Sequence, residues 1–258
     1  MLFTSSVDGR ARRSGKTIED DPQPRRDPVL NRFPKTPMKP STVLIVAPHP
    51  DDETLGCGGT FAKRIEAGFK VVVVVLTDGR NLFRLSPLKI ERDPTPQETS
   101  EMRKNETRRS VQILGGDRAE IYFFDYEDGR LAEFAGEASQ KLAKLIREAI
   151  PNEIWVTSEH EEHRDHIAAC AVARSARAQS DSRARLFRYI TILRPGLALA
   201  EIPDPRLEED ISRQRNLKRT AISQFESHLK IMAKGQKEPF FKTADAWLGD
   251  KEVFFVDP

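Results

Sequence analysis

Residues 43–53 read VLIVAPHPDDE, so that a run of five apolar residues leads directly into a histidine and three acidic residues. A short apolar run of this kind, followed by a polar loop, is typical of a buried strand. Residues 71–75 are five consecutive valines, as expected for a central parallel strand that helices cover on both faces. Ligands of such open sheets bind beyond the carboxyl ends of the strands. The histidine and the acidic residues are therefore expected to face a pocket.

The chain after residue 41 continues this alternation of strands and helices. We predict further strands at residues 120–124, 153–157, 186–193 and 253–256, the last of them at an edge of the sheet. We predict helices at residues 54–67, 100–114, 131–149, 166–178 and 208–234. Residues 80–98 contain three prolines and are expected to form a long irregular loop. The pattern predicts a Rossmann-like α/β fold, in which helices flank a mostly parallel sheet, with a single domain at residues 41–258.

Residues 1–40 differ from the rest in composition. They hold six prolines and nine Lys and Arg residues against five Asp and Glu residues, with almost no periodic apolar pattern. We expect a flexible, Pro-rich, basic tail.

The overall composition excludes several classes of protein. The 258 residues include 42 Lys and Arg against 40 Asp and Glu, a balance too even to indicate binding to nucleic acid. No stretch approaches the roughly 20 apolar residues that span a bilayer. The polar residues that follow Phe3 lead us to expect no secretory signal. With only Cys57 and Cys170, we expect no disulfide framework and a reducing, cytoplasmic setting. Any metal must then be held by histidines and carboxylates.

A second polar cluster, HEEHRDH at residues 160–166, follows the predicted strand 153–157 and thus lies at the same edge of the sheet as the first. Two histidines and one aspartate would complete three protein ligands, and catalytic zinc sites keep the fourth position for water or substrate. A carboxylate beside such an ion can take the proton of the water that attacks an amide. The alternative, that the acids of residues 51–53 only cap a helix, accounts for one or two carboxylates but not for the histidine.

The stretch PHPDDE at residues 48–53, together with HRDH at residues 163–166, resembles the LmbE/PIG-L family of zinc-dependent N-acetylglucosaminyl deacetylases. The resemblance runs from about Thr42 to the C-terminus. It implies that His49, Asp52 and His166 bind zinc and that Asp51 is the general base that activates a zinc-bound water.

The same resemblance implies roles for three further residues. His163 would stabilise the oxyanion and protonate the departing amine, while Arg103 and Asp128 would contact the substrate. The implied reaction is removal of the N-acetyl group from an acetamido sugar carried by a small molecule or a glycoconjugate. Fe²⁺ or Co²⁺ could replace Zn²⁺, because nitrogen and oxygen ligands do not exclude them.

Two departures from the family pattern are visible. Some members carry a tyrosine two residues before the histidine that matches His163, where this chain has Glu161. His160 or the 80–98 loop is a candidate for the oxyanion contact of that tyrosine. Many members read Ser-Gln where this chain has Ser227 and His228.

Three other functions remain as alternatives. A related zinc amidase could act on a different amide, such as that of a thiol conjugate. The GCGG stretch at residues 56–59 suggests a dinucleotide-binding module, but these glycines follow an acidic turn that would repel a pyrophosphate. A binding protein could keep the metal without catalysis, and an assay with N-acetylated sugars separates it from an enzyme.

Overall fold

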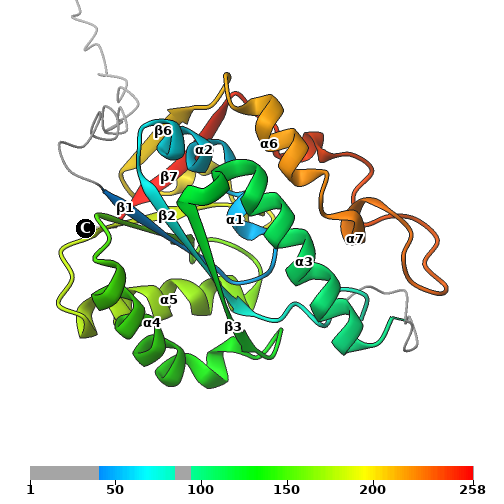
Figure 1. The fold of residues 1–258 in the computed structure, drawn as a ribbon, viewed down its shortest axis with the longest axis horizontal. Coiled ribbons are helices and arrows are strands. Elements are labelled where there is room, and N and C mark those ends of the chain that lie inside the picture. Colours follow the sequence, from blue (N-terminus) through cyan, green and yellow to red (C-terminus); the bar gives the residue numbers. More distant parts are fainter. Residues whose placement is uncertain (1–40, 85–93, 258) are drawn as a thin grey trace, which may run out of the picture.

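The computed structural model describes residues 41–84 and 94–257 and has a seven-stranded sheet at its centre (Figure 1). The strands are β1 (Thr42–Ala47), β2 (Lys70–Thr77), β3 (Ala119–Tyr126), β4 (Glu153–Thr157), β5 (Arg185–Tyr189), β6 (Arg206–Asp210) and β7 (Lys251–Val256). Their order is β3-β2-β1-β4-β5-β7-β6. Strands β1 to β5 are parallel, and β7 pairs antiparallel with both β5 and β6. The predicted fold class is confirmed. The predicted tail at residues 1–40 and the middle of the predicted 80–98 loop lie outside the described residues.

Helices cover both faces of this sheet (Figure 1). The helices are α1 (Asp52–Leu55), α2 (Gly58–Glu66), α3 (Pro96–Gly115), α4 (Ala135–Ala149), α5 (Arg164–Gln179), α6 (Arg215–Ile222) and α7 (Glu226–Leu229). Short 3₁₀ helices are η1 (Gly116–Arg118), η2 (Leu131–Phe134), η3 (Leu199–Glu201) and η4 (Ala244–Trp247). Helices α4 and α5 pack on one face, whereas α2, α3 and α6 pack on the other.

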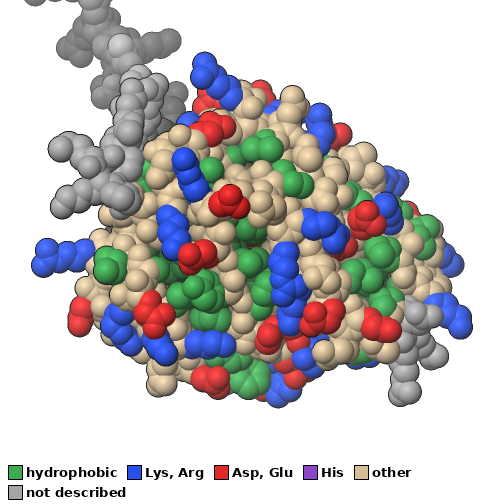
Figure 2. All heavy atoms as spheres, in the orientation of Figure 1, with side chains coloured by type: hydrophobic (Ala, Val, Ile, Leu, Met, Phe, Trp, Pro, Cys, Tyr) green, Lys and Arg blue, Asp and Glu red, His purple; other side chains and the backbone are tan. Residues whose placement is uncertain are grey.

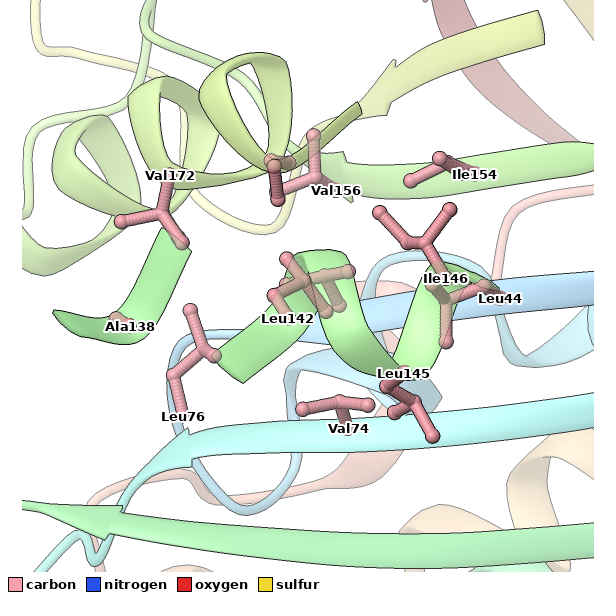
Figure 3. Packing of buried hydrophobic residues seen from close by; sticks show 14 of the residues in the cluster. Leu44, Val74, Leu76, Ala138, Leu142, Leu145, Ile146, Ile154, Val156 and Val172 are labelled. Carbon is pink, nitrogen blue, oxygen red and sulfur yellow. The ribbon is translucent and has the colours of Figure 1, made fainter. Parts of the chain in front are cut away.

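The valine-rich strands are buried on both faces, as their sequence predicts. Leu44 and Val74 point toward α4, where Leu142 and Ile146 pack against the sheet (Figure 3). Val73 belongs to the separate cluster on the opposite face. Complete burial of one such aliphatic side chain stabilises the fold by about 1.5–3 kcal/mol. The two clusters therefore hold the central strands, and with them the loops at the strand ends, in fixed positions.

Helix α3 and the helix predicted at residues 54–67 differ from the prediction. Helix α3 begins at Pro96 rather than at residue 100, because Thr95 and Glu98 form a capping box and proline is tolerated in the first turn. The helix predicted at residues 54–67 is divided into α1 and α2. The break follows Gly56, where an added Cβ would lie 2.3 Å from Cδ2 of Tyr189. The chain passes the Tyr189 ring too closely there for any larger residue.

The prediction of a long helix at residues 208–234 is wrong. Its first part lies in strand β6, and the remainder forms the separate helices α6 and α7. Pairing with β7 outweighs helix propensity, because it buries Leu207 and Glu209 on alternate positions of β6. Strand β7 in turn lies between β5 and β6 and is not the predicted edge strand.

The surface carries charges of both signs. Lys and Arg side chains alternate with Asp and Glu over the face shown in Figure 2, and neither sign dominates the described part of that face. Among the described helices, none combines the length and apolar character needed to cross a bilayer. The cytoplasmic setting expected from the sequence stays a prediction.

Candidate functional site

The candidate site lies at the carboxyl ends of the central strands. The chain connects β1 to its neighbour β2 on one side, whereas β4 lies on the other side of β1, so the strand order reverses there. Ligands of open α/β sheets bind at such a switch point. A cavity of about 280 Å³ opens at this place. It is lined by all the site residues expected from the sequence: His49, Asp51, Asp52, Arg103, Asp128, His163 and His166.

Three of these residues bring their side-chain atoms into a small triangle. Nδ1 of His49 lies 3.1 Å from Nε2 of His166. Oδ2 of Asp52 lies 3.3 Å from each of these nitrogens. In a tetrahedral zinc site with bonds of about 2.0–2.1 Å, neighbouring ligand atoms are roughly 3.3 Å apart. The triangle of His49, Asp52 and His166 therefore has the size that a tetrahedral ion requires.

The outer nitrogen of each imidazole in this triangle meets a buried carboxylate. Nε2 of His49 lies 3.3 Å from Oδ2 of Asp165, and Nδ1 of His166 lies 3.0 Å from Oε2 of Glu161. Carboxylates in this position orient histidine ligands of metal ions and make them more basic. Both imidazoles are thus arranged to direct their inner nitrogens at a common point.

A second group of possible ligands, His49, Asp128 and Asp165, lies on the other side of the His49 ring. Both oxygens of Asp165 already accept hydrogen bonds, from the backbone N–H groups of Gly129 and Leu131, at 2.6 and 3.1 Å. A third group joins His163 to His49 and His166. The triangle with Asp52 is the arrangement in which each histidine keeps a carboxylate on its outer nitrogen.

The charges around the triangle favour a cation. Burial alone would lower the pKa of His49, but three neighbouring carboxylates raise it well above its usual value. These carboxylates belong to Asp128, Asp165 and Asp52. Burial also lowers the pKa of His166, but the charge of Asp52 and the contacts with Asp52 and Glu161 together raise it to about 9. These carboxylates stabilise the positive charge of the protonated imidazoles. A divalent ion bound in the triangle could supply that positive charge instead.

His163 has the opposite character. Burial first, and then the charges of His49 and His166, lower its pKa to about 4, so the ring is neutral at pH 7. Its Nδ1 accepts a hydrogen bond from the backbone N–H of Asp165, at 3.2 Å. We infer that the single ring proton lies on Nε2, since a neutral imidazole carries one proton. His163 can therefore donate a hydrogen bond.

Asp51 lies at the N-terminus of α1 in a strained backbone conformation, with φ 143°. A non-glycine residue in such a conformation costs on the order of 1–3 kcal/mol and is found mainly at functional sites. The backbone N–H of Asp51 donates to Oε2 of Glu53, at 3.1 Å. The side-chain oxygen Oδ2 of Asp51 lies 3.0 Å from Nη2 of Arg103 and 3.0 Å from Nε2 of His228.

The two residues expected to contact substrate also bind the protein itself. Arg103 donates to the carbonyl oxygens of Gly79 and Pro50, each at 3.0 Å, in addition to Asp51. Oδ2 of Asp128 accepts a hydrogen bond from the backbone N–H of Asn81, at 3.0 Å. Both residues line the cavity but are almost completely buried.

The sequence did not reveal two residues of this site. In the sequence, Glu161 stands out only as a departure from a tyrosine, yet it lies against His166. His228 stands out only as a departure from a glutamine, yet it lies against Asp51. Both contacts join residues from separate segments, and only the proximity of Glu161 to the HRDH stretch hinted at the first. His160 does not line the cavity; its Nε2 lies 3.1 Å from Oδ2 of Asp204, so it is not placed to replace the tyrosine.

Comparisons with known proteins show which family this chain resembles. The family model described as "PIG-L: GlcNAc-PI de-N-acetylase" matches residues 44–177, which include every member of the triangle. The diacetylchitobiose deacetylase of Thermococcus kodakarensis is 32% identical over 129 residues, which are 48% of this chain and 44% of that protein. The 1D-myo-inositol 2-acetamido-2-deoxy-alpha-D-glucopyranoside deacetylase of Kineococcus radiotolerans is 32% identical over 98 residues, 38% of this chain and 27% of that protein. The chain thus spans less than half the length of these two relatives.

The fold also resembles a solved structure. The N,N'-diacetylchitobiose deacetylase of Pyrococcus horikoshii, solved with its inhibitor MPG, superposes with a TM-score of 0.65 at 24% identity. The match covers 84% of each chain. At this identity the likeness concerns the fold.

Proposed function

Because the chain belongs to the PIG-L family of GlcNAc-PI de-N-acetylases, we propose that it is a zinc-dependent N-deacetylase acting on acetamido sugars of the N-acetylglucosamine type. The observation that carries this proposal is the triangle of His49, Asp52 and His166 with a further carboxylate, Asp51, in the same cavity. Metal-assisted hydrolysis of an amide uses an ion that polarises the carbonyl and a base that takes a proton from water.

The proposed metal ligands are Nδ1 of His49, Oδ2 of Asp52 and Nε2 of His166. Three protein ligands of this kind suit catalytic Zn²⁺, with Fe²⁺ and Co²⁺ as alternatives. When bound, such an ion polarises the acetamide carbonyl and lowers the pKa of water towards about 7.

Asp51 would transfer the proton, and His163 would stabilise the oxyanion. Within the described residues, Oδ1 of Asp51 has no hydrogen-bond partner, so it is available to take a proton from the attacking water. The water oxygen bonds to the acetamide carbon, and the C–N bond then breaks. A neutral His163 keeps its only ring proton, so it would donate a hydrogen bond from Nε2 to the developing oxyanion. The proton that Asp51 took from the water would pass to the nitrogen as the amine leaves. The products are acetate and the free amino sugar.

The walls of the cavity suit a sugar with a further group attached. Asp128 would accept a hydrogen bond from a sugar hydroxyl, and Arg103 would contact the substrate beyond the acetamido group. Leu82, Ile192 and Phe241 form an apolar part of the wall. We propose that a small molecule or a glycoconjugate carrying the acetamido sugar binds there.

The proposal predicts metal-dependent release of acetate. Purified protein loaded with Zn²⁺ should hold about one ion per chain and should release acetate and free amine from N-acetylglucosamine or N,N'-diacetylchitobiose. Chelation should abolish the release, and added Zn²⁺ should restore it. Metal content would be measured by mass spectrometry and the products by an amine-detecting reagent and an acetate assay. Zinc-loaded protein that released no acetate from a panel of acetamido sugars would contradict the proposal.

Glu161 provides a second prediction. Its Oε2 meets Nδ1 of His166 and also accepts from the backbone N–H of Ile192. Glu161→Gln replaces one carboxylate oxygen by an amide NH₂ group, which would face other hydrogen-bond donors. The substitution should therefore weaken zinc binding by about 10- to 100-fold. Competition with a zinc-binding dye would measure this change.

Glu159→Gln is the matched control, because Glu159 contacts Arg174 and Arg188 and does not line the cavity. Its zinc affinity should equal that of the wild-type protein. Equal zinc affinity for Glu161→Gln would show that the carboxylate does not support a metal ligand.

A further inference from the structure

Taking Asp51 as the base of the proposed function, we propose that His228 is a positioning residue that holds this carboxylate in its reactive orientation. His228 comes from α7, far along the chain from Asp51, and lies against it inside the cavity. Both side chains are buried, so solvent does not compete for the contact.

Both partners of the Asp51 carboxylate contact the same oxygen. Nε2 of His228 and Nη2 of Arg103 each lie 3.0 Å from Oδ2. Because two donors on one oxygen oppose rotation of the carboxylate, Oδ1 is left as the oxygen available to take a proton. An ionised carboxylate has no proton to offer, so Nε2 of His228 must be the donor in this contact.

The position of His228 is itself fixed by a buried chain of hydrogen bonds. Oγ of Ser227 lies 3.1 Å from Nδ1 of His228. The Ser227 hydroxyl donates to Oε2 of Glu106 at 2.6 Å, and its backbone N–H donates to Oε1 at 2.8 Å. Glu106 belongs to α3, the helix that also carries Arg103. One helix therefore supports both donors of Asp51, one directly and one through Ser227.

Aromatic packing holds the plane of the His228 ring. The ring of Phe241 is stacked on it, with centroids 5.3 Å apart and an angle of 4° between the planes. Phe225 meets the ring edge-on, with centroids 6.4 Å apart. The imidazole therefore has no free rotation, and its Nε2 stays directed at Asp51.

Removal of the donor should affect turnover more than substrate binding. His228→Ala should lower kcat by about 10- to 100-fold, the effect expected when a buried charged group loses a polar partner. KM should change by no more than about twofold, and the zinc content should remain that of the wild type. His228→Gln supplies an amide N–H in place of the imidazole N–H and should recover most of the lost kcat. His160→Ala is the matched control, because His160 lies outside the cavity, and it should keep wild-type kcat.

The double variant Asp51→Asn/His228→Ala tests whether His228 acts through Asp51. If it does, the double variant should be no slower than Asp51→Asn alone, since the carboxylate that His228 positions is already absent. A further 10- to 100-fold loss in the double variant would mean that His228 acts on substrate by itself, and would overturn this inference while leaving the proposed function intact. Wild-type turnover by Asp51→Asn would overturn both.

Discussion

Asp51→Asn is expected to lower kcat for acetate release by about 10²- to 10⁴-fold, the usual contribution of a general base. Asparagine has nearly the same shape as aspartate, and its carbonyl oxygen can still accept from Arg103 and contact His228. The amide nitrogen would then replace Oδ1, and it cannot take a proton from water. The fold and the zinc content should therefore persist while turnover is lost, which steady-state kinetics and metal analysis of the same sample would measure.

Asp204→Asn is the control for this replacement. Asp204 pairs with His160 and Arg188 and does not line the cavity. Its kcat should match the wild type. If Asp51→Asn retained more than about a tenth of the wild-type kcat with full zinc content, Asp51 would not be the base.

The second large effect concerns stability. Nζ of Lys218 donates to Oε1 of Glu252 at 2.7 Å and to the carbonyl oxygen of Leu55 at 2.8 Å, and the lysine is almost fully buried. Lys218→Met leaves the Glu252 carboxylate buried without its cation, a change that costs about 3–5 kcal/mol. We expect a value near 3 kcal/mol, because Glu252 keeps hydrogen bonds from Gly59 and Thr60. Urea denaturation would measure the free energy of unfolding.

Two variants distinguish the effect of the buried charge on stability from the effect of losing the lysine side chain. Lys251→Met breaks a contact with Glu208 at an exposed site and should change stability little. Lys218→Met/Glu252→Gln removes the uncompensated charge and should recover part of the loss. A loss for Lys218→Met no larger than that for Lys251→Met would mean that the buried pair does not stabilise the fold.

The fold was predictable from the sequence where local pattern and tertiary contacts agree. The valines at residues 71–75 can only be buried on both faces, so the central sheet follows from them. Residues 208–210 are acidic and favour a helix by composition, but β7 pairs with them and they lie in a strand. Residues that pair with a strand distant in sequence carry no local signal of that pairing.

Some residues of the candidate site were likewise predictable from the sequence, and others were not. His49 and His166 each follow a predicted strand, and parallel strands bring their carboxyl ends to one edge, so their meeting could be expected. Glu161 and His228 contact His166 and Asp51, and these contacts depend on where a loop and a short helix come to lie. Residue type alone does not indicate such contacts.

The order of these segments along the chain has a consequence for biosynthesis. A growing polypeptide folds from its N-terminus, and β1 to β5 leave the ribosome before α7 does. His49, Asp52 and His166 can therefore come together while the nascent molecule still lacks His228. Ion capture and full hydrolytic competence would then be acquired at different moments, with the second waiting until α7 has been synthesised.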